Sequence, residues 1–219
     1  MFKSQDKQDY ILYHHVFKSF ENGIFVDVGA HDGIKFNNTY YFENNHNWTG
    51  INIEPMNNIY NLLVQNRPKC INLNCAVSNY NGIGKFKHIS GISDMLSGLE
   101  ESYHPKHKAR INDEIRKHNQ VSSTIEIPVK TLDIILKTNN INKINYLSID
   151  VEGGELNVLK SINYDDVFID VIGFECNYRE LLPEIINFLE SKNFKRIFNN
   201  KSSLDIFMIN NNSKFLKNL

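Results

Sequence analysis

The sequence has few cysteines, no long apolar run and little net charge. Its 219 residues include three cysteines without a C-x-x-C pair, which argues against a disulfide framework and a zinc knuckle. The formal net charge is -1, so no overall field attracts nucleic acid or an anionic membrane. No segment has the apolar length of a membrane span or the apolar core of a signal peptide. We therefore expect one cytoplasmic domain with no membrane span and no nucleic-acid partner, acting on a small molecule.

The first glycine-rich turn also lacks the middle glycine of a dinucleotide fingerprint. The turn runs from Gly29 to Gly33 after an apolar run, residues 24–28, that predicts a buried parallel strand. Ala30 stands where a pyrophosphate requires glycine, which disfavours a dinucleotide. S-adenosylmethionine, which has a ribose and a carboxylate but no phosphate, tolerates this alanine because the turn amides need to hold only a small anion.

A second short strand, residues 49–53, ends in Glu54 about 20 residues after the turn. A carboxylate at this position can accept hydrogen bonds from both hydroxyls of a ribose. The turn and Glu54 together predict a nucleoside-cofactor site.

Strand and helix patterns alternate along most of the chain. Helices are expected at residues 5–20, 57–65, 132–137, 155–161 and 180–191, and strands at 24–28, 49–53, 69–77, 84–89, 124–129, 145–151, 171–176, 194–198 and 204–209. This order predicts an α/β fold whose mostly parallel sheet has one antiparallel strand, helices on both faces and a terminal hairpin turning at residues 199–203. The polar residues 91–123 show little periodicity and are expected to form an inserted, lid-like segment of a single domain, residues 1–219.

A series of motifs extends from Ser4 to about Asn177. They are Ser4-Gln5-x-x-Gln8-Asp9, Val26-Asp27-Val28-Gly29-Ala30-His31-Asp32-Gly33, Asn38-Thr39, Ile53-Glu54-Pro55, Thr131-Leu132-Asp133 and Leu147-Ser148-Ile149-Asp150-Val151-Glu152-Gly153-Gly154-Glu155-x-x-Val158-Leu159. In this order they resemble the FkbM family of class I S-adenosylmethionine-dependent methyltransferases. The resemblance implies a Rossmann-like, seven-stranded sheet and methylation of a hydroxyl group, commonly on a sugar. The chain departs from the family pattern at Ser148, where a lysine is frequent, and residues 91–123 carry no motif that can be aligned.

The resemblance also implies a cofactor site made by the N-terminal helix, the first turn and the strand ends. The expected cofactor-binding residues are Gln5, Asp27, Gly29, Ala30, His31, Asp32, Gly33, Thr39, Glu54, Pro55, Ala76, Val77 and Asp150. Glu152 and Glu155 flank Gly153-Gly154 at a helix start, where capping is the expected role of at least one of them.

Methyl transfer to a hydroxyl needs a group that takes the hydroxyl proton. The catalytic candidates are Asp150 and Glu175, which follow two successive strands, and His107 in the inserted segment. By resemblance to metal-dependent O-methyltransferases, Asp150, Glu175 and Asn177 form a candidate site for Mg²⁺ or Mn²⁺. The alternative is that Asp150 acts without a metal.

The sequence thus predicts an S-adenosylmethionine-dependent O-methyltransferase whose acceptor is a sugar of a glycan or nucleotide-linked precursor, or another hydroxyl-bearing small molecule. Two other functions stay open: a nicotinamide-dependent dehydrogenase, which Ala30 disfavours, and a non-catalytic adaptor with a decayed methyltransferase fold. A homodimer and a piece of a longer multidomain enzyme are both compatible with the sequence.

Overall fold

The computed structural model describes residues 1–198 and 204–219, so the expected hairpin turn at 199–203 lies outside the described residues. Within them, the main sheet consists of β1 (Ile24–Val28), β2 (Thr49–Ile53), β3 (Ile71–Leu73), β8 (Lys143–Ile149), β9 (Phe168–Glu175), β10 (Phe194–Ile197) and β11 (Asp205–Asn210). Their spatial order is β10-β11-β9-β8-β1-β2-β3, and β11 runs antiparallel to both of its neighbours. The predicted seven-stranded, mostly parallel sheet is confirmed.

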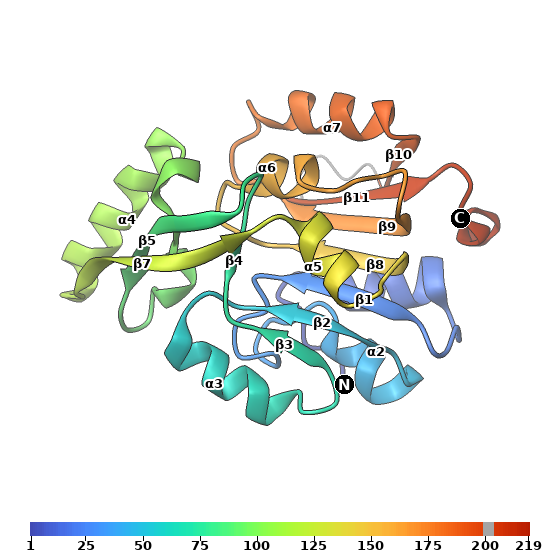
Figure 1. Ribbon diagram of the computed structural model, residues 1–219, viewed down its shortest axis with the longest axis horizontal. Helices are drawn as coiled ribbons and strands as arrows, with labels where there is room; N and C mark the ends of the chain where they lie inside the picture. Colours follow the sequence, from blue (N-terminus) through green and yellow to red (C-terminus); the bar gives the residue numbers. More distant parts are fainter. Residues whose placement is uncertain (199–203) are drawn as a thin grey trace.

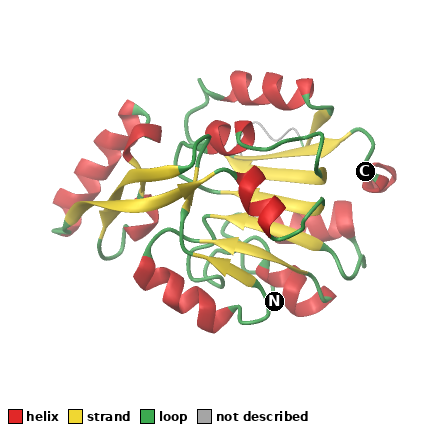
Figure 2. Ribbon diagram, in the orientation of Figure 1, coloured by secondary structure: helices red, strands yellow, loops and turns green. Residues whose placement is uncertain are grey.

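Helices cover both faces of this sheet (Figure 2). One apolar core packs the main sheet against α5 (Leu132–Thr138), α6 (Glu155–Lys160) and α7 (Leu182–Ser191). The opposite core packs it against α1 (Gln8–Leu12), the π-helical η1 (Tyr13–Phe17), α2 (Tyr40–His46) and the 3₁₀ helix η4 (Lys214–Asn218). Alternate residues of a strand point to opposite faces, so Val26 and Val28 lie in the first core and Phe25 in the second. The α3 helix (Asn57–Asn66) follows β2.

Two short helices differ from the prediction. The helix expected over residues 5–20 ends at Phe17, because Lys18 has a φ of +51° that no helix continues. The following ring, Phe20, packs against Trp48 and Phe215 instead. The α2 helix was not predicted, since its single buried residue, Phe42, produces no apolar period.

The strand expected over residues 69–77 divides between two sheets. Its first part is β3, and its second part, β4 (Ala76–Val77), pairs in parallel with β7 (Ser122–Lys130). The bend lies at Asn74, whose side-chain amide donates to the carbonyl oxygens of Glu54 and Pro55. The second sheet has the order β4-β7-β5-β6, with β5 at Gly82–Ile89 and β6 at Gly98–Leu99. The hydrogen bonds of Asn74 to the segment after β2 are tertiary contacts. No local sequence pattern reveals them, so the sequence predicted a single strand here.

The inserted segment, residues 91–123, is more ordered than its weak periodicity indicated. It contains the 3₁₀ helices η2 (Asp94–Leu96) and η3 (Glu100–Ser102), the strand β6, and the 14-residue helix α4 (Pro105–His118). The buried residues of α4 are His107 and Ile111, with Ile115 packed partly behind them. These three residues are spaced four apart, as on one face of a helix. Because one of them is a histidine, the apolar pattern in the sequence is incomplete. Figure 1 shows the second sheet and α4 on the left, beside the carboxyl ends of the main strands.

No helix among residues 1–198 and 204–219 is both long and apolar enough to cross a membrane.

Candidate active site

A cavity of about 230 Å³ lies where the carboxyl ends of β1, β2, β8 and β9 meet the inserted segment. The predicted site residues that line it are Gln5, Asp27, Gly29, Ala30, His31, Glu54, Pro55, Ala76, Val77, Asp150 and Glu175. The predicted residues that do not line it are Asp32, Gly33, Thr39, His107 and Asn177. The structure therefore brings most of the predicted set, drawn from distant parts of the chain, to one space.

The turn after β1 passes close to the end of β8. Gly29 has a φ of +86°, and a Cβ added there would lie 1.8 Å from the main-chain oxygen of Asp150. The amides of Gly29 and Ala30 both donate to the carbonyl of Ile53 at 3.0 Å. Glycine at position 29 thus permits the approach of two chain segments, in addition to lining the cavity.

Asp32 and Gly33 shape the second half of this turn. The Asp32 Oδ1 atom accepts hydrogen bonds from the amides of Ile34 and Lys35 at 2.8 Å. Gly33 has a φ of +79°, and a Cβ there would lie 2.7 Å from Cγ of Arg67. In this structure both residues act on the shape of the turn, and neither lines the cavity.

Glu54, at the end of β2, is held by two main-chain amides. It is 5% exposed; Oε1 accepts from the amide of Met56 at 2.8 Å and Oε2 from the amide of His31 at 3.1 Å. Burial raises the pKa of Glu54 to about 7, and the two amide hydrogen bonds oppose that shift. The carboxyl group is therefore fixed in position with further lone pairs toward the cavity that it lines.

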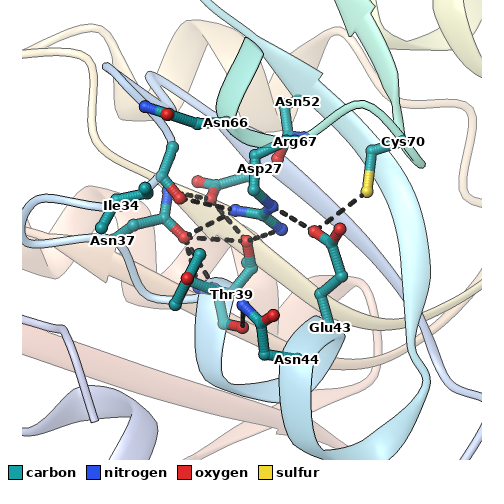
Figure 3. A network of polar contacts seen from close by, with 12 residues as sticks. Asp27, Ile34, Asn37, Thr39, Glu43, Asn44, Asn52, Asn66, Arg67 and Cys70 are labelled. Carbon is teal, nitrogen blue, oxygen red and sulfur yellow. Dashed lines mark hydrogen bonds and ion pairs between the residues drawn. The ribbon is translucent and has the colours of Figure 1, made fainter. Parts of the chain in front are cut away.

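A buried polar network lies behind Asp27 (Figure 3). The Asp27 Oδ2 atom accepts hydrogen bonds from Asn37 Nδ2 at 2.9 Å and from Thr39 Oγ1 at 2.8 Å. The fully buried Arg67 donates to Asn37 Oδ1, to Thr39 Oγ1 and to the carboxylate of Glu43. Burial raises the pKa of Asp27, and the Arg67 guanidinium opposes that rise. Thr39, expected at the cofactor, thus positions Asp27 from behind.

Acidic side chains gather at the other end of the cavity. Asp150 is exposed to the cavity, and its enclosure within the protein raises its pKa, as do the neighbouring Glu152 and Glu175. Burial likewise raises the pKa of Glu175, whereas Arg110 and a hydrogen bond with Asn177 lower it. Arg110 belongs to α4 and also lines the cavity. Burial and mutual repulsion thus both raise the pKa values of the carboxyl groups at this end.

Glu155 performs the predicted capping role at the start of α6. Its Oε1 atom accepts a hydrogen bond from the amide of Gly153 at 2.9 Å, and burial raises its pKa to about 7. Glu152, by contrast, lines the cavity.

His107 is fully buried in α4, behind the cavity wall. Its Nδ1 atom lies 3.0 Å from the Tyr178 hydroxyl and its Nε2 atom 3.2 Å from the Leu96 carbonyl. Burial lowers the pKa of His107. Because both ring nitrogens already have partners and His107 does not line the cavity, the geometry does not favour His107 as the proton acceptor.

Comparison with known proteins identifies the family. The model of the FkbM methyltransferase domain matches residues 27–196, which is most of the chain. The chain belongs to the FkbM methyltransferase family. No curated protein matches it. The chemistry of the family is methyl transfer from S-adenosylmethionine.

A solved structure shows the same fold. The FkbM methyltransferase from Methylobacillus flagellatus KT has a TM-score of 0.51 at 13% identity, covering 86% of this chain and 43% of that one. This chain therefore spans less than half the length of that protein. Fibrillarin from Aeropyrum pernix, solved with natively bound S-adenosyl-L-methionine, has a TM-score of 0.49 at 10% identity over 94% of this chain and 74% of its own.

In this FkbM domain, the structure adds residues that sequence reasoning missed. Arg67 and Asn37 support Asp27, and Arg110 and Asp94 line the cavity from the inserted segment. None stands in a recognisable motif, so only the tertiary contacts reveal them. The predicted metal site is not supported: the described residues contain no group of three or more His, Cys, Asp or Glu side chains placed to hold an ion.

Proposed function

We propose that this FkbM domain transfers a methyl group from S-adenosylmethionine to a hydroxyl group of a sugar. The observation that carries the proposal is that one cavity joins Glu54, at the end of β2, to Asp150 and Glu175, at the ends of β8 and β9. A carboxylate suited to a ribose and carboxylates suited to an acceptor hydroxyl therefore border the same space.

The side chains near Glu54 fit a nucleoside. The two carboxylate oxygens each keep a lone pair for a ribose hydroxyl, because each accepts a single amide hydrogen bond. Met56, Ala76 and Val77 line the cavity with apolar surface that suits an adenine ring. Asp27 lines the same cavity, where its carboxylate can pair with a ligand ammonium group. Bound S-adenosylmethionine would supply an electrophilic methyl group on its sulfonium.

Asp150 is our candidate for the group that takes the acceptor proton. Its carboxyl group is open to the cavity and its raised pKa makes the ionised form a stronger base than an ordinary aspartate. Glu175 borders the same end of the cavity and can orient the acceptor by accepting a second hydroxyl hydrogen bond. The enclosing inserted segment keeps bulk water from the hydroxyl oxygen.

A metal-assisted form of the proposal places Mg²⁺ or Mn²⁺ on Asp150, Glu175 and Asn177. It would relieve the mutual repulsion of the two carboxylates. The Asn177 side chain, however, forms a hydrogen bond with Glu175 and is not part of the cavity lining. We therefore propose the metal-free form and make the metal an arm of the test.

The test is calorimetric titration with S-adenosylmethionine and S-adenosylhomocysteine, with and without Mg²⁺ or Mn²⁺, followed by transfer of a labelled methyl group to a panel of sugars. We expect micromolar cofactor binding that metal leaves unchanged. Asp150→Asn should lower the transfer rate about 10²- to 10⁴-fold, the usual contribution of a positioned base. A metal-dependent gain in affinity would support the metal-assisted form instead.

Two outcomes would favour the alternative functions. Binding of NAD in the same cavity would point to a dehydrogenase. Absence of binding by either cofactor would point to a non-catalytic adaptor and would contradict the proposal.

A further inference from the structure

Glu152 has an unusual backbone and an unpartnered oxygen. Its φ is +56°, a region that residues other than glycine seldom adopt. The side chain is 11% exposed, and Oε2 is buried without a hydrogen-bond partner. A buried acceptor that receives no proton is costly, and such strain gathers at functional sites. Glu152 itself lines the cavity, so its carboxyl group can receive a donor from a ligand there.

The neighbouring histidine cannot supply it. The carbonyl of Leu96 only accepts, so the proton of the neutral His107 ring must lie on Nε2, 3.2 Å away. Nδ1 is then an acceptor, and it receives the Tyr178 hydroxyl at 3.0 Å. The 3.5 Å between His107 Nδ1 and Glu152 Oε2 thus separates two acceptors, not the members of an ion pair.

The charged residues that line the cavity also favour a ligand that donates hydrogen bonds. Among the described residues that line it, eight carry carboxyl groups and two, Lys35 and Arg110, carry permanent cations. Besides Glu54, Asp27 and Asp94, which lies 3.5 Å from His31, the carboxyl groups belong to Asp6, Asp150, Glu152, Glu175 and Asp205. A further free acceptor, Oδ1 of Asn38, lines the same space. Such a surface attracts hydrogen-bond donors and cations and repels phosphates.

We propose that Glu152 binds a hydrogen-bond donor of the methyl acceptor, and that this acceptor is an amino sugar and not a phosphate-bearing sugar. The inference rests on the proposed function and narrows its substrate class. An ammonium group would be attracted by the carboxyl groups of Glu152, Asp150 and Glu175, whereas the phosphates of a nucleotide-linked sugar would face these carboxyl groups.

Proton release is a signature of this arrangement. Burial, and then Glu175, raise the pKa of Glu152 to about 8, and Arg110 opposes the rise. The other titratable groups that face it are Tyr103, His107, Asp150, Glu155 and Tyr178, from the strand, helix and loop segments packed around it. A bound ammonium favours the ionised carboxylate, so binding below pH 8 expels a proton.

The experiment compares three probes: methyl glucosaminide, methyl glucoside and glucose 1-phosphate. Each is titrated into the whole chain by calorimetry, with and without saturating S-adenosylhomocysteine, in two buffers of different ionisation enthalpy. We expect the glucosaminide to bind at least tenfold more tightly than the glucoside and to release protons. Glu152→Gln, of nearly the same shape, should remove both effects. Glu180→Gln, at an exposed carboxylate that pairs with Lys106, should leave them intact.

Three results would overturn the inference: equal or tighter binding of glucose 1-phosphate, no binding of any probe, or an amine preference that survives Glu152→Gln. Binding of S-adenosylhomocysteine by the wild type and by Glu152→Gln shows that both are folded. It also separates this proposal from the previous one. Cofactor binding without amine preference contradicts only the acceptor class, and absence of cofactor binding contradicts the methyltransferase proposal.

Discussion

Buried carboxyl groups have different partners at the two ends of the cavity. Behind Asp27, the carboxylates and the fully buried Arg67 pair through direct hydrogen bonds and through Asn37 and Thr39 (Figure 3). Around Asp150, carboxyl groups raise one another's pKa, and Glu152 Oε2 has no partner.

We interpret the network behind Asp27 as structural support and the carboxyl groups around Asp150 as a candidate binding surface. A satisfied network rigidifies the turn that a cofactor needs before it arrives. An unsatisfied group destabilises the empty protein, and a ligand that supplies a partner relieves this cost. Removing one charged group should therefore lower the free energy of unfolding at the Asp27 end and raise it at the Asp150 end.

Arg67→Met should give the largest effect. It leaves Glu43 and Asp27 buried without their cation, so we expect a loss of about 3–5 kcal/mol in the free energy of unfolding. Urea denaturation measures it. The control is Lys137→Met, at an exposed pair with Asp133, which should cost less than about 1 kcal/mol. A similar cost for both variants would deny the network its supporting role.

Gly29→Ala should follow in size. The new Cβ would press on the Asp150 carbonyl at a φ of +86°, and overpacking with a strained φ costs about 2–4 kcal/mol. The same denaturation experiment checks the loss. Ala30→Gly, one residue on, should cost about 1 kcal/mol or less, and equal losses would show that the close approach is unimportant.

Glu54→Ala tests the cofactor end through ligand affinity. Charge-assisted hydrogen bonds to a ribose are worth about 1.5–3 kcal/mol, so S-adenosylhomocysteine should bind at least tenfold more weakly. Calorimetry measures the change. Asp94→Asn, at another carboxylate of the lining, should alter the affinity less than about threefold. Unchanged affinity in Glu54→Ala would remove Glu54 from the ribose.

The buried carboxyl groups of the cavity should make the free energy of unfolding depend on pH. The folded-state pKa values of Glu54 and Glu155, about 7, and of Glu152, about 8, lie above their ordinary 4.5. For acids with raised pKa values, the stabilisation is complete below pH 4.5 and is lost as the pH rises through the folded values. The free energy of unfolding should therefore fall between about pH 5 and pH 8, by up to about 1.4 kcal/mol per pH unit for each proton.

Glu152→Gln removes one of these protons. Its stability curve should be flatter than that of the wild type, with a gain over the wild type that grows by up to about 1.4 kcal/mol per pH unit between pH 5 and pH 8. Denaturation at a series of pH values measures both curves. Parallel curves would mean that Glu152 does not carry a raised pKa.

The sequence predicted the main sheet because its central strands are buried on both faces. β8 and β9 are almost entirely buried, so each reads as a continuous apolar run. The turn and Glu54 were equally visible, since their chemistry depends on spacing within one β-α-β unit.

The remainder depended on contacts between distant residues. Arg67 lies far from Asp27 in sequence, and nothing local says which cation a buried carboxylate will meet. The α4 helix was not predicted because a buried histidine interrupts its apolar pattern. The break between β3 and β4, at Asn74, arises from hydrogen bonds to the segment after β2. Glu152 looked like a capping residue because Glu155, three residues later, has that role.

The pairing of β4 with β7 has a consequence for insertions and deletions. Ala76 lies beside Val129 and Val77 beside Lys130, so residues 78–128 leave and rejoin the rest of the chain at neighbouring positions. This block has an apolar cluster of its own, with Ile89, Leu96, Tyr103 and Ile111. Because its two ends meet, a change in its length need not move the strands of the main sheet that end at Glu54 and Asp150.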